Sequence, residues 1–283
     1  MQIDLKMMKP KMIDNLDSNS NQDFLSANMG RVLNKTKLSK TLDSYELIID
    51  AINGDDTIAD GSVELPFKTI TSAYNYLPDF VNNAILNIKD GTYKEHSSIQ
   101  LYKNIVKLTI KAFNTSNTSN VVIMCNEEDT RDSLLYITNS HKIIIENIKF
   151  NRSGNHTSGS CINIDCTNFD INNCLFENSY IAITSSCCHG QINSCQFDNL
   201  YNAINANKAS NILSTNNESL NLVEYGIISN GSIVFNYGDN LTGTIEDYIT
   251  TLYGRVFNTS RDIAVASIES NGSIISRGDT AIS

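Results

Sequence analysis

A short pattern that returns at nearly constant spacing constrains this chain more than any other feature. Its copies run from Ile145 to Phe150, from Ile171 to Phe176 and from Ile192 to Phe197, so that successive copies start 26 and 21 residues apart. A second pattern accompanies it at 180–183 and 201–204, with a looser copy at 225–228. Self-similarity with a period in the low twenties is typical of a solenoid.

The residues within each copy indicate strands. Apolar residues stand two apart, as in Cys174 and Phe176, or cluster in short β-branched runs such as 143–145. Asn, Ser and Gly separate these segments, which are too short for helices. One such coil cannot bury its apolar face, so coils must stack and pair their strands in parallel, about 4.8 Å apart. The sequence therefore predicts a parallel β-helix.

Stacking predicts which side chains share a column. Phe150, Phe176 and Phe197 fall on one column, which we expect to fill the inside of the coils with aromatic rings. Asn172 falls over Asn193, where the two amides are expected to hydrogen-bond along the stack.

The cysteines follow the same period. Cys174 falls over Cys195, and Cys166 stands 21 residues before Cys187, so we expect inward columns of small apolar residues. The chain has seven cysteines, an odd number that favours free thiols in a reducing compartment over a disulfide framework.

Charge and hydropathy exclude several classes of partner. The net charge of −10 argues against non-specific nucleic-acid binding, which basic surfaces drive. We find no apolar run of about 18 residues and no secretory signal peptide, so neither a membrane span nor export by that route is expected, and synthesis is expected in a cytoplasm.

Two parts of the chain are predicted: residues 1–44 as an anchoring or oligomerisation segment, and 45–283 as the β-helix. The first part is polar and contains a short helical pattern whose apolar stripe is formed by Leu25, Met29, Val32 and Leu33. A helix this short is marginal in water alone, so the stripe is expected to pack on copies of itself or on another protein.

The segment DNLDSNSNQDFLSANMGRVLN, residues 14–34, resembles a segment found near the N-termini of many bacteriophage tail-fibre and baseplate proteins. The resemblance implies a homotrimer in a virion, in the tail or baseplate, with other tail or baseplate proteins as partners. The alternative interpretation of these residues is an ordinary surface helix.

Another helix is expected where the β-helix begins. Ile70, Ala73, Tyr74 and Leu77 take helical spacing before Pro78, and a helix at this place would cap the open end of the solenoid. Residues 45–112 resemble the opening of right-handed parallel β-helix proteins of the pectate-lyase-like superfamily. The resemblance rests on the strings NGDD, DGS, PFKTITSA, ILNIKDGTYKE and LTIKA. The implied fold class is all-β, a right-handed parallel β-helix with a short helical or extended attachment segment and a capping helix. The superfamily holds lyases, hydrolases and inert modules, so it implies no activity.

The weak catalytic candidates are Glu177 and Asp198, which follow two phenylalanines of the column as Asn151 follows the third. Stacked, their carboxylates would approach the roughly 5 Å separation of a retaining glycosidase, or could share a calcium ion. The competing interpretation is a pair of solvated acids at a turn. Arg152 is the basic residue that we expect beside this column, a full coil away.

No cofactor or metal site is predicted. Cys187, Cys188 and His189, with Cys195, are metal ligands by type, but the spacing of zinc sites is missing, and a core role for one cysteine of the pair is favoured. The tripeptide at 277–279 copies an integrin-binding motif, which we interpret as a coincidence in a terminal turn.

The C-terminal part continues the repeat. Residues 229–238 and 270–278 echo one another 41 residues apart, about two coils, and 239–256 between them is either a lateral loop or a wider coil.

Three functions remain open at this point. The leading hypothesis is a structural component of a phage tail or related contractile particle. The alternative is a tailspike that binds or cleaves a host cell-surface glycan, as a lyase or glycoside hydrolase. The third, a free secreted polysaccharide lyase, is weakened by the missing signal peptide.

Overall fold

The computed structural model of the chain divides into two compact units, Met1–Asp43 and Ser44–Ser283. It describes residues 44–95, 98–114, 120–124, 133–138, 140–152, 158–241, 246–251, 254–258, 266–268 and 273–276, together with two short strands in the first unit. Those strands, β1 (Met12–Ile13) and β2 (Phe24–Leu25), pair in parallel.

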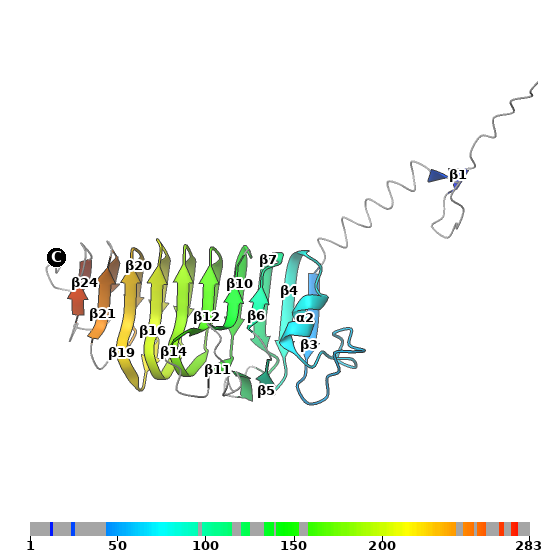
Figure 1. The fold of residues 1–283 in the computed structure, drawn as a ribbon, viewed down its shortest axis with the longest axis horizontal. Helices are drawn as coiled ribbons and strands as arrows, with labels where there is room; N and C mark the ends of the chain where they lie inside the picture. The colour runs from blue at the N-terminus through cyan, green and yellow to red at the C-terminus, as the bar shows by residue number, and fades with distance from the viewer. Residues whose placement is uncertain are drawn as a thin grey trace, which may run out of the picture. The chain divides into compact units, whose positions relative to one another are not determined.

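The second unit is a right-handed parallel β-helix, as predicted (Figure 1). One wall is a 10-stranded sheet. In chain order its strands are β3 (Ser44–Ile49), β4 (Phe80–Ile88), β7 (Asn104–Ala112), β10 (Lys142–Glu146), β13 (Asn168–Asn172), β15 (His189–Asn193), β17 (Asn211–Thr215), β20 (Ile233–Tyr237), β22 (Arg255–Asn258) and β24 (Ser273–Ser276).

The remaining wall is a 12-stranded sheet that bends around the coil. Its strands are β5 (Gly91–Lys94), β6 (Ile99–Leu101), β8 (Val121–Met124), β9 (Ser133–Ile137), β11 (Lys149–Asn151), β12 (Ser160–Asp165), β14 (Leu175–Ser186), β16 (Gln196–Asn207), β18 (Glu218–Ser219), β19 (Leu222–Asn230), β21 (Glu246–Thr251) and β23 (Ala266–Ile268). Residues 239–256 thus contribute β21 and the start of β22 to the two walls, as a further coil.

The register confirms the repeat read from the sequence. Ile145 pairs with Ile171, and Ile171 with Ile192. The rings of Phe150, Phe176 and Phe197 are fully buried and stack with centroids 5.3 and 5.4 Å apart, so the aromatic column lies inside the coils as expected. β20 and β24 stand two places apart in the 10-stranded sheet, so the C-terminal echo spans two coils as expected. The ladders align Ile233 with Arg255 and Arg255 with Ser273, a register of 40 residues, one fewer than the 41 of the echo.

Left-handed corners join the two sheets. Asn147, Asn173, Ser194 and Asn216 occupy one column of such corners, with φ of 59°, 51°, 54° and 53°. Asparagine tolerates this conformation better than most residues. At this corner the Asn173 side-chain amide donates one hydrogen bond along the stack, to the Asn147 side-chain oxygen.

The asparagine pair predicted to bond along the stack is in register but bonds differently. Asn172 pairs with Asn193 in the ladder, yet its amide donates to Glu146, at 3.4 Å.

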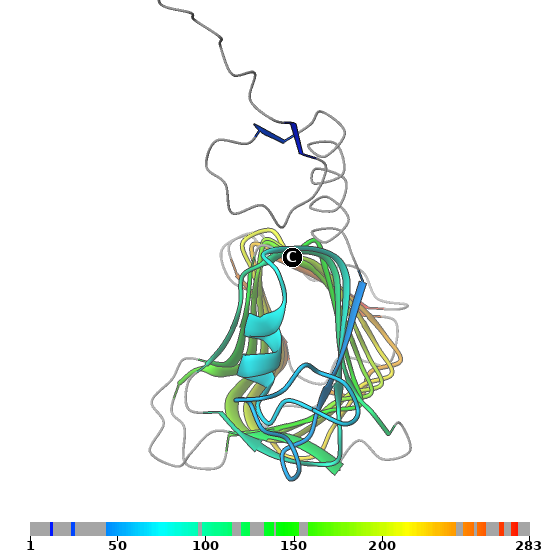
Figure 2. The same cartoon turned by 90° about the vertical axis from the view of Figure 1, so that its right-hand side faces the viewer.

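The predicted cap is present as α2 (Ile70–Tyr76). Thr69 is its N-cap, and the Glu95 carboxylate accepts a hydrogen bond from the Ile70 amide at 2.8 Å. Three residues of the helix are buried, namely Ile70, Ala73 and Tyr74. Figure 2 looks onto the end of the stack that begins with β3 and shows α2 at that end. Within the described residues, no helix is long and apolar enough to cross a membrane.

Candidate functional site

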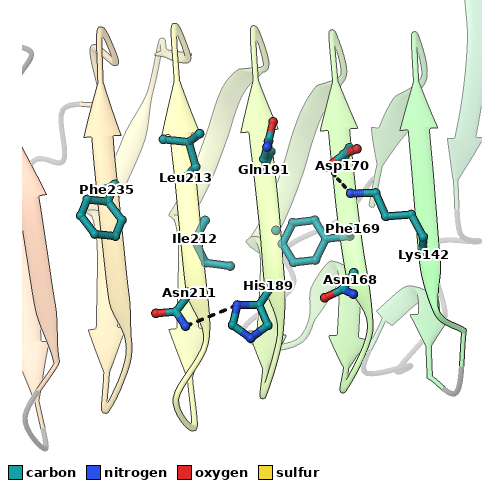
Figure 3. Close-up of a pocket in the computed structure, with 11 residues that line it drawn as sticks. Lys142, Asn168, Phe169, Asp170, His189, Gln191, Asn211, Ile212, Leu213 and Phe235 are labelled. Atoms are coloured by element: carbon teal, nitrogen blue, oxygen red, sulfur yellow. Dashed lines mark hydrogen bonds and ion pairs between the residues drawn. The ribbon is translucent and has the colours of Figure 1, made fainter.

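A groove of about 470 Å³ crosses the outer face of the 10-stranded sheet, over β10, β13, β15, β17 and β20 (Figure 3). Strand alternation places residues two apart on the same face, so each strand contributes one or two outward side chains. We refer to this feature as the groove. Its lining residues are Lys142, Asn168, Phe169, Asp170, His189, Gly190, Gln191, Asn211, Ile212, Leu213 and Phe235.

Ladder pairing arranges the outward side chains in rows along the solenoid axis. In one row Asp170 pairs with Gln191, Gln191 with Leu213, and Leu213 with Phe235. The row therefore changes from polar to apolar along the groove. Beyond it, Phe235 stacks on Phe257 of β22, with centroids 4.9 Å apart and planes 13° apart.

A second, polar row lies beside the first. It holds His189 and Asn211, which pair in the ladder, and Asn168 one coil earlier. The Asn211 amide nitrogen and His189 Nδ1 lie 3.4 Å apart. These imidazole and amide groups offer donors and acceptors at a surface open to solvent.

Charge in the groove is largely cancelled within it. Lys142 Nζ lies 2.5 Å from an Asp170 carboxylate oxygen. An anionic ligand would therefore have to compete with Asp170 for this ammonium group.

Gly190, in the floor of the groove, is a position where a side chain would not fit. Gly190 faces Phe169 in the ladder, and a Cβ at Gly190 would lie 2.1 Å from the buried Phe169 ring. Ile212, which pairs with Gly190 on the other side, is also buried. The missing side chain lets the ring pass beneath β15.

Glu177 and Asp198 lie side by side, as predicted, but each carboxylate interacts with other side chains. They pair in the ladder of β14 and β16. Glu177 Oε2 lies 2.7 Å from Lys149 Nζ and accepts a hydrogen bond from Asn151 at 3.2 Å. An Asp198 oxygen accepts one from Asn221 at 2.7 Å. Their use as an acid and base pair stays a prediction, and these contacts favour a structural role.

The basic residue beside this column is Lys149, and the expectation of Arg152 needs correction. Arg152 is 1% exposed and its guanidinium donates to the Ser160 carbonyl at 3.2 Å. Lys149 stands two residues before Asn151 on β11, so strand alternation was the signal that could have identified it.

The cysteine expectations are confirmed for one column and wrong for the other. Cys174 and Cys195 are buried, whereas Cys166 and Cys187 are exposed, because both lie at left-handed corners with φ of 49° and 56°. Cys188 is buried, as expected for one member of its pair.

The residues considered for metal binding do not converge. Cys188 is buried, while His189 lies on the groove. Across the described part of the chain, no group of three or more His, Cys, Asp or Glu is placed to hold a metal ion.

Of the attachment residues, Leu25 was expected in a helix, and this expectation is wrong: Leu25 lies in strand β2, where it pairs in parallel with Ile13. Met29, Val32 and Leu33 lie outside the described residues, as does the tripeptide at 277–279. Their role in assembly stays a prediction.

Comparison with known proteins supports the fold. No protein-family model matches the chain, and neither does any curated protein sequence. Among solved structures, a rhamnogalacturonan lyase superposes with a TM-score of 0.56 and 11% identity, over 80% of this chain and 73% of the other. A pectin methylesterase from Erwinia chrysanthemi superposes with a TM-score of 0.54 and 10% identity, over 83% of this chain and 81% of the other. The chain therefore shares the parallel β-helix fold of these two proteins.

Proposed function

We propose that the protein binds an extended polysaccharide along the groove. The observation that carries the proposal is the row from Asp170 through Gln191 and Leu213 to Phe235. A sugar ring has an apolar face of C–H groups and a rim of hydroxyls, and this row offers an aromatic platform beside amide and carboxylate groups. Both superposed structures carry the names of polysaccharide-active enzymes, which fits this class of ligand.

The geometry suits a chain that lies parallel to the solenoid axis. Neighbouring coils are about 4.8 Å apart, close to the length that one hexose adds to an extended polysaccharide. Each coil would then present one or two outward side chains to each successive sugar.

Charge favours a neutral glycan over a polyuronate. The chain carries a net charge of −10, and Lys142 is already paired with Asp170. A polyanion would meet long-range repulsion and find this ammonium occupied.

The test is titration calorimetry with neutral oligosaccharides and with oligogalacturonate. Phe235→Ala and Gln191→Ala should each weaken neutral-glycan binding by about 10-fold or more, as expected for central contacts. Phe113→Ala is the matched control, because Phe113 is an exposed phenylalanine outside the groove and its loss should leave affinity unchanged.

Equal affinity of Phe235→Ala and the parent protein, or binding of oligogalacturonate alone, would contradict the proposal. New reducing ends or unsaturated products in the same mixtures would indicate cleavage, and Glu177→Gln and Asp198→Asn would then test whether these acids perform it.

A second proposal concerns where the module acts. The segment that resembles phage tail-fibre and baseplate proteins, residues 14–34, falls within the first compact unit and outside the β-helix. We propose that this unit attaches the β-helix to a tail or baseplate as a homotrimer, so that the groove contacts a host-surface glycan.

A further inference from the structure

Two thiols lie exposed at the same corner of successive coils. Cys166 follows β12, whose last residue Asp165 pairs with Ser186, and Cys187 follows Ser186. Both backbones are left-handed, with φ of 49° and 56°, so the two side chains leave their coils at equivalent angles. The Cys166 backbone N–H donates to the Ser186 carbonyl at 2.9 Å, so the two corners are stacked neighbours.

This spacing matches the requirements of a disulfide. Neighbouring parallel coils stand about 4.8 Å apart, within the range of about 4.4–6.8 Å between the Cα atoms of bonded cysteines. Lys208 occupies the next position of the corner column, with φ of 52°. Desolvation, followed by the neighbouring Cys187 and Asp165, raises the pKa of the Cys166 thiol, and the Lys208 ammonium group opposes this only in part.

We propose that Cys166 and Cys187 are a redox modification site that forms a reversible disulfide between two coils. With hydrogen peroxide as oxidant, one thiol is converted to a sulfenic acid with release of water. The other thiol then attacks the sulfenic sulfur, which forms the S–S bond and releases a second water, so two thiols lose two hydrogens and one peroxide is reduced.

The bond would join strand ends that lead into the groove. Cys166 lies two residues before Asn168, and Cys187 two residues before His189. The proposal stands on the corner geometry and does not depend on the ligand of the groove.

The chain contains its own control. Cys174 and Cys195 are stacked with the same 21-residue spacing but are buried, and their thiols donate to the carbonyls of Asn172 and Asn193. Burial also raises the pKa of the Cys174 thiol. Peroxide should therefore oxidise the exposed pair and spare the buried one.

The experiment treats the full-length protein with hydrogen peroxide at pH 8, blocks remaining thiols with N-ethylmaleimide, and digests it at acidic residues. Asp170 and Glu177 lie between the two cysteines, so a disulfide would connect two separate peptides in the mass spectrum. We expect the Cys166–Cys187 linkage, its loss with dithiothreitol, and a melting temperature raised by about 3–8 °C in the oxidised form.

Cys187→Ser should form no linked peptides, leaving Cys166 as a sulfenic acid or thiol. The proposal is overturned if the parent protein keeps both thiols alkylatable, if it links either one to another cysteine, or if both oxidise to sulfinic acid without a link.

Discussion

At the scale of single residues, an acid inside the coil sets a pH dependence. Asp239 is 2% exposed, and its carboxylate accepts hydrogen bonds from the Ser214 hydroxyl and from the backbone and side chain of Asn217. Burial raises the pKa of Asp239 to about 6, although the hydrogen bonds oppose this. The folded protein therefore holds a proton that the unfolded chain, with an ordinary pKa of 3.8, releases.

The sign of the effect follows from this difference in proton binding. The raised pKa contributes stability that is fully present below pH 4 and is lost as pH rises through 6. Between pH 5 and pH 8 we expect this contribution to the free energy of unfolding to fall by about 1.4 kcal/mol.

Urea unfolding of the parent protein and of Asp239→Asn at pH 5, 6, 7 and 8 measures the contribution of Asp239 to the free energy of unfolding. The difference between the two proteins should decline with pH by that amount, since other titrating groups cancel. A difference that is flat or rises with pH would show that Asp239 titrates normally.

At the scale of elements, the pairing of β13 with β15 depends on Gly190. Any side chain there would meet the Phe169 ring, and glycine within a strand often marks such a close approach. We expect Gly190→Ala to destabilise the protein by about 1–3 kcal/mol through overpacking.

A double mutant separates this clash from a general loss of strand structure. Phe169→Leu gives the new methyl group room, so the combined variant should lose less stability than the sum of the two single variants in denaturant titrations. Gln191→Ala, at the exposed neighbouring position, should change stability by less than about 0.5 kcal/mol. Strict additivity would mean that Phe169 is not the obstacle.

At the scale of the whole molecule, the division at residue 43 predicts independent folding of the β-helix. Its first strand starts at Ser44, and α2, Thr69 and Glu95 belong to the second unit. Deletion of residues 1–43 should leave the thermal unfolding of the β-helix unchanged.

Assembly is expected to respond differently to that deletion. Leu25, Met29, Val32 and Leu33 are lost, so light scattering should report a trimer for the full-length protein and a monomer for the truncated one. A full-length monomer, or a truncated trimer, would contradict the assignment of assembly to this segment.

The repeat in the sequence determined that the chain forms a parallel β-helix. Phe150, Phe176 and Phe197 could be placed in one buried column because the coils stack in parallel, and equal spacing then decides which residues are neighbours. The cap at Ile70–Tyr76 was predictable for a similar reason, since helical spacing and an N-cap are local signals.

Only the tertiary structure decided which side chains face outward at the corners and what meets there. Cys166 and Cys187 share the period of the core cysteines, yet their left-handed backbones turn them to solvent, and the period carries no information about φ. The groove likewise joins side chains from five strands. Its shape depends on the sizes of side chains that are adjacent on the sheet but a full coil apart in the sequence. The period of the repeat determines which residues stack on one another. Backbone conformation and packing determine which of their side chains are exposed to solvent.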